Sequence, residues 1–346
     1  MGRTWFLDRP SRTLDSLVLG IAILSTPQIN PQNSSLPPYT PAHQVSGVIR
    51  IWGSPQMSGL LHRYEEGFQK AQPSVRFENS LKSTITGVAG VYTGRADVAL
   101  LGREIWPIEA QAFQSVTGHP PIAIEIATGS YDVPKATYAL MILVNRSNPI
   151  ASLSTVQLDR IFGNTRQNPV RAWGDLGLRG AWAKRNIHLY GFSADNDKAL
   201  IFSRLIFRQS TGWNCKLQEY SNSVGDNAAD AGDLIAQAVA KDPAGIGISN
   251  IHYATSGDKV LALSTQESET PVTPTRENIA SRRYPLFRAV YMVIDPGNDH
   301  PRMPPVLEFL HYVLSGQGQE DVGSEGTYLP LISDMAKEQL RLLDAR

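Results

Sequence analysis

Two long apolar runs, far apart in the chain, constrain the fold more than any other feature of the sequence. The first run covers residues 138–144 and the second covers residues 286–294. Runs this apolar are typical of strands buried on both faces of a sheet. If the chain crosses between two lobes at both runs, one lobe holds both chain ends and the middle segment forms the other. Two lobes joined by two crossings make a hinge with a cleft.

The rest of the chain alternates between strand-like and helix-like patterns. We expect strands over 47–52, 75–79, 96–101, 121–127, 187–191 and 245–249, and helices over 60–71, 86–93, 155–162, 198–208, 230–240, 305–315 and 333–343. This alternation predicts an α/β fold with parallel, doubly wound sheets. A chain of 346 residues is longer than one average domain, which agrees with two lobes.

The N-terminus has the features of an export signal. Arg3, Arg9 and Arg12 precede a short apolar run at 17–24, which is too short to cross a bilayer but has the length of a signal-peptide core. We therefore predict a signal peptide at 1–28, a Pro/Ser/Asn-rich linker at 29–44, and a periplasmic or other extracytoplasmic location. The alternative interpretation of the apolar run is a first buried helix.

Composition and motifs exclude several classes of function. The chain has 32 basic and 32 acidic residues, so no basic bias indicates a nucleic-acid binder. The single cysteine, Cys215, rules out an internal disulfide or a multi-thiolate zinc site, and we expect a buried or half-buried thiol. Motifs for phosphate loops, dinucleotide sites, zinc proteases and nucleophile elbows are absent from the sequence. We therefore predict a non-enzymatic protein without cofactor or metal.

Several phrases resemble the substrate-binding proteins of bacterial phosphate ABC transporters. They lie at 94–99, 144–150, 153–163, 173–177, 242–247, 274–279, 284–291 and 309–318, in the order of that family. The resemblance implies a type II periplasmic-binding-protein-like fold: two lobes, each a mixed sheet flanked by helices, joined by a two-crossover hinge. We place lobe 1 at 45–138 plus 290–346 and lobe 2 at 139–289.

The family holds its oxyanion at loops that open onto the cleft, with helix N-terminal amides, hydroxyls and an arginine. By resemblance, the first loop supplies Ser54, and the second supplies Ser83, Thr84 and Thr86. Arg103 follows the strand at 96–101, whose carboxyl end is expected to face the cleft. The alternative roles are helix capping for the hydroxyls and a surface position for Arg103.

The third loop departs from the family pattern. Phe192 stands where the family has an arginine, and Asn196, Asp197 and Lys198 stand where it has Ser-Gly-Thr. Lys198 is expected to restore positive charge as a flexible point charge, and Asn196 or Asp197 to cap the next helix. Three outcomes stay open: phosphate binding by a rearranged site, binding of another oxyanion or small organic acid, and loss of the ligand.

The resemblance implies a solute-binding protein that takes up inorganic phosphate or a related small anion and delivers it to the membrane permease of an ABC transporter. The family also implies a monomer. Two alternatives remain at this point: a sensory or scaffold binding module of the same fold, and an enzyme such as a phosphatase, which would need a nucleophile or metal cluster.

Overall fold

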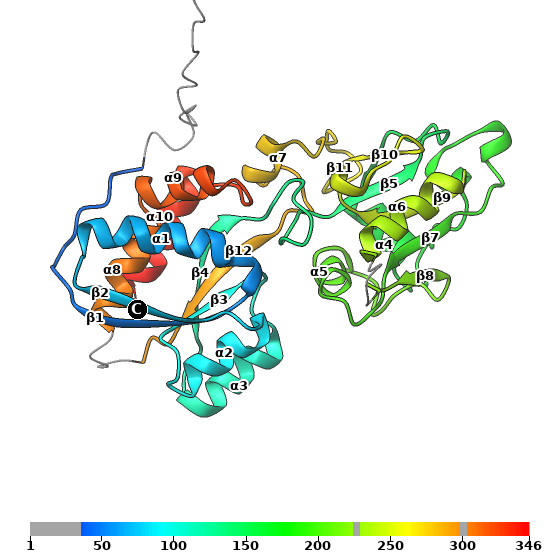
Figure 1. The fold of residues 1–346 in the computed structure, drawn as a ribbon. Helices are drawn as coiled ribbons and strands as arrows, with labels where there is room; N and C mark the ends of the chain where they lie inside the picture. The colour runs from blue at the N-terminus through cyan, green and yellow to red at the C-terminus, as the bar shows by residue number, and fades with distance from the viewer. Residues whose placement is uncertain (1–35, 224–228, 298–302, 346) are drawn as a thin grey trace, which may run out of the picture.

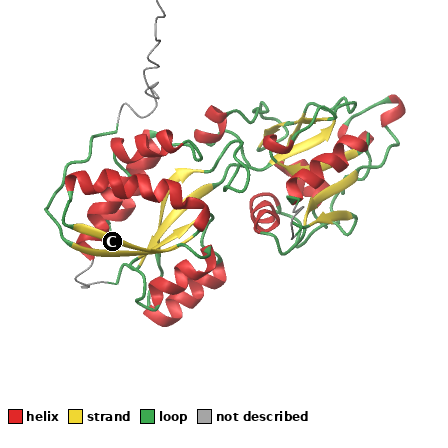
Figure 2. Ribbon diagram, in the orientation of Figure 1, coloured by secondary structure: helices red, strands yellow, loops and turns green. Residues whose placement is uncertain are grey.

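The computed structural model describes residues 36–223, 229–297 and 303–345. The predicted signal peptide lies outside the described residues. The chain forms two lobes, each a sheet covered by helices (Figures 1 and 2). No described helix combines the length and the apolar character that crossing a membrane requires.

Lobe 1 is built on a five-stranded sheet in the order β2-β1-β3-β12-β4. Its strands are β1 (Gly47–Gly53), β2 (Val75–Ser80), β3 (Val98–Leu101), β4 (Ile122–Thr128) and β12 (Ala289–Ile294). Its helices are the 3-10 turn η1 (Pro55–Met57), α1 (Ser58–Ala71), α2 (Thr84–Tyr92), α3 (Pro107–Thr117), α8 (Met303–Val313), α9 (Gly316–Glu325) and α10 (Ser333–Asp344). In Figure 1, α1, α9 and α10 lie on one side of the sheet, and α2 and α3 lie on the other.

Lobe 2 has a five-stranded sheet in the order β10-β5-β9-β7-β8 and a small sheet of two strands. Its strands are β5 (Met141–Asn145), β6 (Ser152–Ser154), β7 (His188–Phe192), β8 (Leu217–Tyr220), β9 (Gly245–Ser249), β10 (Asp258–Val260) and β11 (Ala262–Ser264). Its helices are α4 (Thr155–Phe162), η2 (Trp173–Leu176), η3 (Gly180–Trp182), α5 (Asp197–Ile206), α6 (Ala231–Lys241), η4 (Ile251–Tyr253) and α7 (Arg276–Ala280).

Both large sheets are mixed, as the resemblance implied, and the expectation of purely parallel sheets from alternation alone is wrong. In lobe 1, β1 runs parallel to β2 and β3, whereas β12 runs antiparallel to β3 and β4. The chain leaves lobe 1 at the carboxyl end of β4 and returns at the amino end of β12. Because the chain leaves and re-enters lobe 1 on the side facing lobe 2, β12 has to run antiparallel to β4.

The two connections between the lobes, residues 129–140 and 286–288, form the hinge. The long apolar runs end inside the sheets as β5 and β12, and the crossings lie at their hinge-side ends. The amide of Gly129 donates to the carbonyl of Arg288 at 2.7 Å, and the amide of Leu140 donates to the carbonyl of Leu286 at 3.0 Å. A side chain at Gly129 would clash, since its Cβ would lie 2.7 Å from the Thr137 carbonyl oxygen. The two connections are therefore hydrogen-bonded to each other.

Each lobe has its own hydrophobic core. The core of lobe 2 packs β5, β9 and β7 against α4, α5 and α6, with Trp173 fully buried among them. The main core of lobe 1 packs β1 and β12 against α1 and α8 around Phe68 and Phe309. A smaller cluster under α2 and α3 includes Phe113. Since the cores are separate, the few residues of the hinge carry the mechanical connection.

Candidate functional site: the interlobe cleft

A cavity of about 450 Å³ opens between the lobes, and loops of both lobes and of the hinge line it. The carboxyl ends of β1 and β3 supply one wall, and the N-terminus of α5 supplies the other. The lining residues that carry charge are Lys82, Arg103, Lys135, Asp195, Asp197, Lys198, Asp230 and Arg288. Five of these are basic and three are acidic, so the cavity is polar with a positive excess.

Ser54 lies at the cleft immediately after β1. It is only 3% exposed, and its amide donates to the Leu100 carbonyl at 2.9 Å. Although Ser54 occupies the N-cap position of η1, its side chain makes no capping hydrogen bond. The capping role considered for this hydroxyl is therefore not realised, and Ser54 lines the cavity.

The second loop places two of its three predicted hydroxyls at the cleft. Ser83 caps α2, because its Oγ accepts from the amide of Ile85 at 3.2 Å, and Thr84 is the first residue of that helix. Both line the cavity. Thr86 lies outside the lining, and its hydroxyl donates to the Ser83 carbonyl at 2.8 Å. The N-terminal end of α2, with its free amides and positive dipole end, borders the cleft.

Arg103 lines the cleft, but its guanidinium is already paired inside lobe 1. The side chain is 4% exposed and donates to both Glu109 carboxylate oxygens, at 2.8 and 2.7 Å. It also stacks at 3.8 Å over the ring of Trp106. An anion at Arg103 would compete with this bidentate pair.

The third loop brings Asp197 and Lys198 to the cleft and leaves Asn196 outside the lining. Asn196 caps α5, since its Oδ1 accepts from the amide of Lys198 at 2.9 Å. The ammonium of Lys198 lies 5.2 Å from the ring of Tyr138 and 5.6 Å from the ring of Phe192. The buried ring of Phe192 therefore fills the position at which the family has an arginine. It provides an aromatic face beside the lysine that supplies the charge.

Arg288 is the most buried charged residue of the cleft lining, and we did not predict it as a site residue from the sequence. It lies in the hinge, is 1% exposed, and lines the cavity. Its Nη1 donates to Asp197 at 3.2 Å, whereas its Nε and Nη2 are buried with no hydrogen-bond partner in the described structure. The sequence signal was a lone charge inside the apolar run at 286–294, which we had taken only as part of a family phrase.

Asp197 is held between two cations. Burial alone would raise the pKa of its carboxyl group, but Arg288 and Lys198 outweigh burial and lower the pKa below its ordinary value. The carboxylate lies 3.2 Å from Arg288 and 3.5 Å from Lys198. At neutral pH it therefore neutralises part of the cleft's positive charge.

This arrangement suits an oxyanion. A buried arginine offers two nitrogens with unused N–H groups, a lysine adds a second charge, and hydroxyls and the end of a helix line the same cavity. Among the residues described, no group of three or more His, Cys, Asp or Glu side chains is placed to hold a metal ion. The class that the fold and the interlobe cleft define is a two-lobed binding protein.

Comparisons with known proteins assign the family. The model of the PBP superfamily domain matches residues 39–317. The phosphate-binding protein PstS of Pseudomonas aeruginosa is 30% identical over 313 residues, which cover 89% of this chain and 91% of the relative. The chain therefore belongs to the PstS-type phosphate-binding protein family within the PBP superfamily.

Solved structures agree on the fold. The chain matches PstS from Borrelia burgdorferi with a TM-score of 0.55 at 18% identity, covering 83% of this chain and 99% of that one. It matches an ABC-type phosphate transport receptor from Vibrio cholerae with a TM-score of 0.54 at 18% identity, covering 82% and 99%. These matches confirm the predicted two-lobed fold.

Proposed function

We propose that this protein binds inorganic phosphate in the interlobe cleft and presents it to the permease of an ABC transporter, outside the cytoplasm. The family assignment supports this function, because the PstS relative is a phosphate-binding protein. The observation that carries the proposal is the buried guanidinium of Arg288, whose Nε and Nη2 lack partners at the cleft. Buried donors without partners are unfavourable, and an anion bound there would satisfy them.

The phosphate would lie between Arg288 and Lys198, with one face toward the N-terminus of α2. Ser54 and Thr84 would donate from lobe 1, and Lys198 would donate from lobe 2. Arg288 takes over the forked, permanent charge that the third loop lost when Phe192 replaced the family arginine. With Phe192 at this position, Arg288 is the arginine that would contact the anion.

Asp197 would select for a protonated oxyanion. An ionised carboxylate only accepts hydrogen bonds. Inorganic phosphate near neutral pH still carries a proton that it can donate, whereas sulfate carries none. Sulfate would therefore face Asp197 with like-charge repulsion and without a compensating hydrogen bond. We expect phosphate to bind more tightly than sulfate for this reason.

The position of Arg288 at the hinge would couple phosphate binding to closure of the two lobes. Arg288 belongs to one crossing, and its carbonyl accepts from Gly129 of the other. A ligand that contacts Arg288, lobe 1 and α5 together binds better when the lobes approach. This differential affinity is what a closure switch requires. The relatives are binding proteins, and we infer that this chain binds without catalysis.

Calorimetric titration with phosphate and sulfate tests the proposal. A chain that begins at Leu36 is suitable because Tyr39 packs edge-on against Tyr312 and its hydroxyl donates to Glu308 at 2.7 Å. We expect the wild-type chain to bind phosphate one-to-one. The Asp197→Asn variant should still bind phosphate, but its preference for phosphate over sulfate should be smaller. Absence of phosphate binding by the wild-type chain would refute the proposed function and favour a scaffold role.

A further inference from the structure

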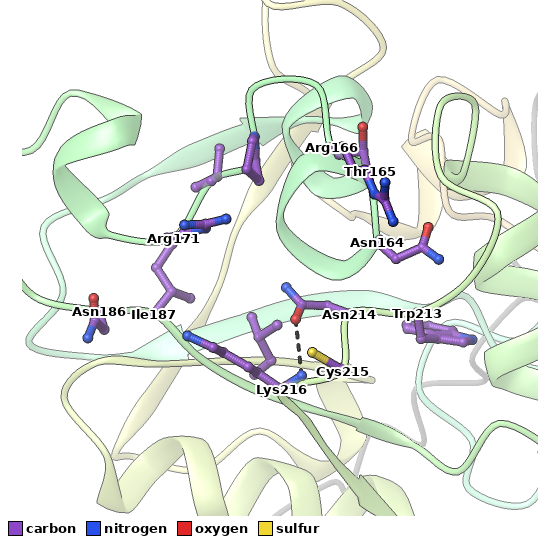
Figure 3. Close-up of a pocket in the computed structure, with 14 residues that line it drawn as sticks. Asn164, Thr165, Arg166, Arg171, Asn186, Ile187, Trp213, Asn214, Cys215 and Lys216 are labelled. Atoms are coloured by element: carbon purple, nitrogen blue, oxygen red, sulfur yellow. Dashed lines mark hydrogen bonds between the residues drawn. The ribbon is translucent and has the colours of Figure 1, made fainter.

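A second cavity, separate from the interlobe cleft, lies in lobe 2 (Figure 3). It encloses about 700 Å³ and shares no lining residue with the cleft. Its walls come from residues 163–171 after α4, residues 186–189 at the start of β7, and residues 213–216 before β8. The volume falls in the range of small-molecule sites, roughly 300–1,000 Å³.

The charge of this cavity is of one sign. Arg166, Arg171 and Lys216 line it, and no carboxylate does. In Figure 3, Arg166 lies on one side of the space, with Arg171 and Lys216 across from it. None of the three cationic groups has an ion-pair partner in the part of the chain that the structure describes. Asp175 lies outside the lining and its Oδ2 accepts from the backbone amides of Arg171 and Ala172, and its carboxylate also attracts the charge of Arg171.

The floor of the cavity is apolar. Five nonpolar side chains line it: Pro169, Val170, Ile187, Leu189 and Trp213. Two of the neighbouring amides are already engaged, since Asn214 donates to the Ile161 carbonyl at 3.0 Å and Asn164 accepts from the amide of Thr211 at 3.0 Å. The exposed cations and Asn186 thus form a polar rim above an apolar base.

We propose that this cavity binds a small organic anion, in which a carboxylate or phosphate ester contacts the cations and an aromatic or aliphatic body covers the apolar floor. Apolar floor and like-charged rim together define this ligand class. Inorganic phosphate has no apolar body and would gain nothing from the floor. This site is therefore distinct in its ligand from the interlobe cleft and works without it.

Cys215 supplies a built-in reporter. It lines this cavity, and it is the only cysteine of the 346 residues. The expectation of a buried or half-buried thiol is wrong, because Cys215 is exposed. The turn before β8 turns the residue outward, so that Leu217 and not Cys215 packs against the core. The rate at which neutral iodoacetamide alkylates the chain therefore reports on this cavity alone.

The test measures that rate with phenyl phosphate as the probe, and with saturating inorganic phosphate in every sample so that the cleft is already occupied. Benzyl alcohol is the neutral aromatic control. If the Kd is about 1 mM, phenyl phosphate at about 10 mM slows alkylation roughly tenfold. The double variant Arg171→Gln with Lys216→Gln should lose this protection, and the exposed Lys184→Gln, outside the lining, should keep it. Rates with and without probe are compared within each variant.

Three results would overturn the proposal. The first is an alkylation rate that phenyl phosphate leaves unchanged in the wild-type chain. The second is equal protection by benzyl alcohol, which would mean that the cations contribute nothing. The third is protection that persists in the double variant. Phosphate titration of the cleft proceeds independently, so failure here leaves the proposed function intact.

Discussion

Replacing Arg288 by methionine separates ligand binding from stability. Methionine has a similar length and no charge, so it fills the hinge position without donors. In the ligand-free protein, the Arg288 side chain makes one hydrogen bond, to Asp197 at 3.2 Å, and its Nε and Nη2 are buried without partners. Those unused donors reduce the stability of the folded state. The variant should therefore lose the ligand while keeping the fold.

The magnitude follows from what each state loses. Removing one member of a buried, hydrogen-bonded charge pair costs about 2–5 kcal/mol of binding free energy, or roughly thirtyfold to several thousandfold in Kd. For the unliganded chain, the variant loses the ion pair with Asp197 but also removes the buried Nε and Nη2 donors that lack partners, so we expect the two effects to offset to within about 1–2 kcal/mol. Asp197 tolerates the change because it is 39% exposed and keeps Lys198 at 3.5 Å.

Calorimetry measures the affinity, and urea unfolding without phosphate measures the stability. Arg204→Met is the matched control, because Arg204 lies exposed on α5 and outside the cleft lining. We expect the control to bind phosphate as the wild type does. If Arg288→Met binds phosphate normally, or unfolds several kcal/mol more easily than the wild type, the assignment of Arg288 is wrong.

Three further changes test other parts of the structure. The pKa of Asp197 is lower in the folded protein than in the unfolded chain, so the carboxylate stabilises the fold above its ordinary pKa of about 3.9. This contribution is lost as the pH falls through the lower folded pKa. The Asp197→Asn variant should therefore show a smaller decline of the urea midpoint below about pH 4. Asp159→Ala should cost about 2–4 kcal/mol in urea unfolding, since its buried Oδ2 accepts from the amides of Arg208 and Gln209, both at 2.8 Å; a loss below about 0.5 kcal/mol would contradict this role. Asn250→Ala should lower the free energy of unfolding by about 1–3 kcal/mol and loosen the hinge, because the Asn250 Nδ2 donates to two carbonyls of the first crossing, at 2.8 and 2.9 Å. An unchanged urea midpoint would refute this role of Asn250.

Elements with regular apolar spacing were predictable. The helix expected at 60–71 is α1, whose buried residues are Leu60, Leu61, Tyr64 and Phe68, the four that define its apolar face in the sequence. The strand expected at 245–249 is β9, buried at every position. In both, local pattern and tertiary burial act in the same direction, so the sequence alone suffices.

Elements that tertiary contacts stabilise were missed. α9 is polar and has three glycines, a composition that does not predict a helix. It forms because Ser315 caps it and because Gly318 lies against the preceding turn, where a Cβ would come within 2.3 Å of the carbonyl oxygens of Tyr312 and Val313. A close approach of this kind depends on the fold and leaves no periodic signal.

The sequence named many of the residues that line the cleft, but it did not name Arg288. The loops named from the resemblance do meet at the cleft, as Ser54, Thr84 and Lys198 illustrate. Arg103 had a local signal that we did not use: Glu109 follows at the third position of α3, and its carboxylate also accepts from the amide of Trp106 at 2.8 Å. Arg288 required knowledge of the hinge, because only the fold shows which end of an apolar strand opens onto a cleft.

A crystal structure of the chain from Leu36 onward, grown with phosphate, tests the central claim most directly. The account predicts one phosphate in the interlobe cleft, with Arg288 Nε and Nη2 and the Lys198 ammonium within hydrogen-bond distance, and with the lobes closer together than in the structure described. Phosphate bound elsewhere, or a cleft in which Arg288 remains without an anion at saturating phosphate, would contradict it.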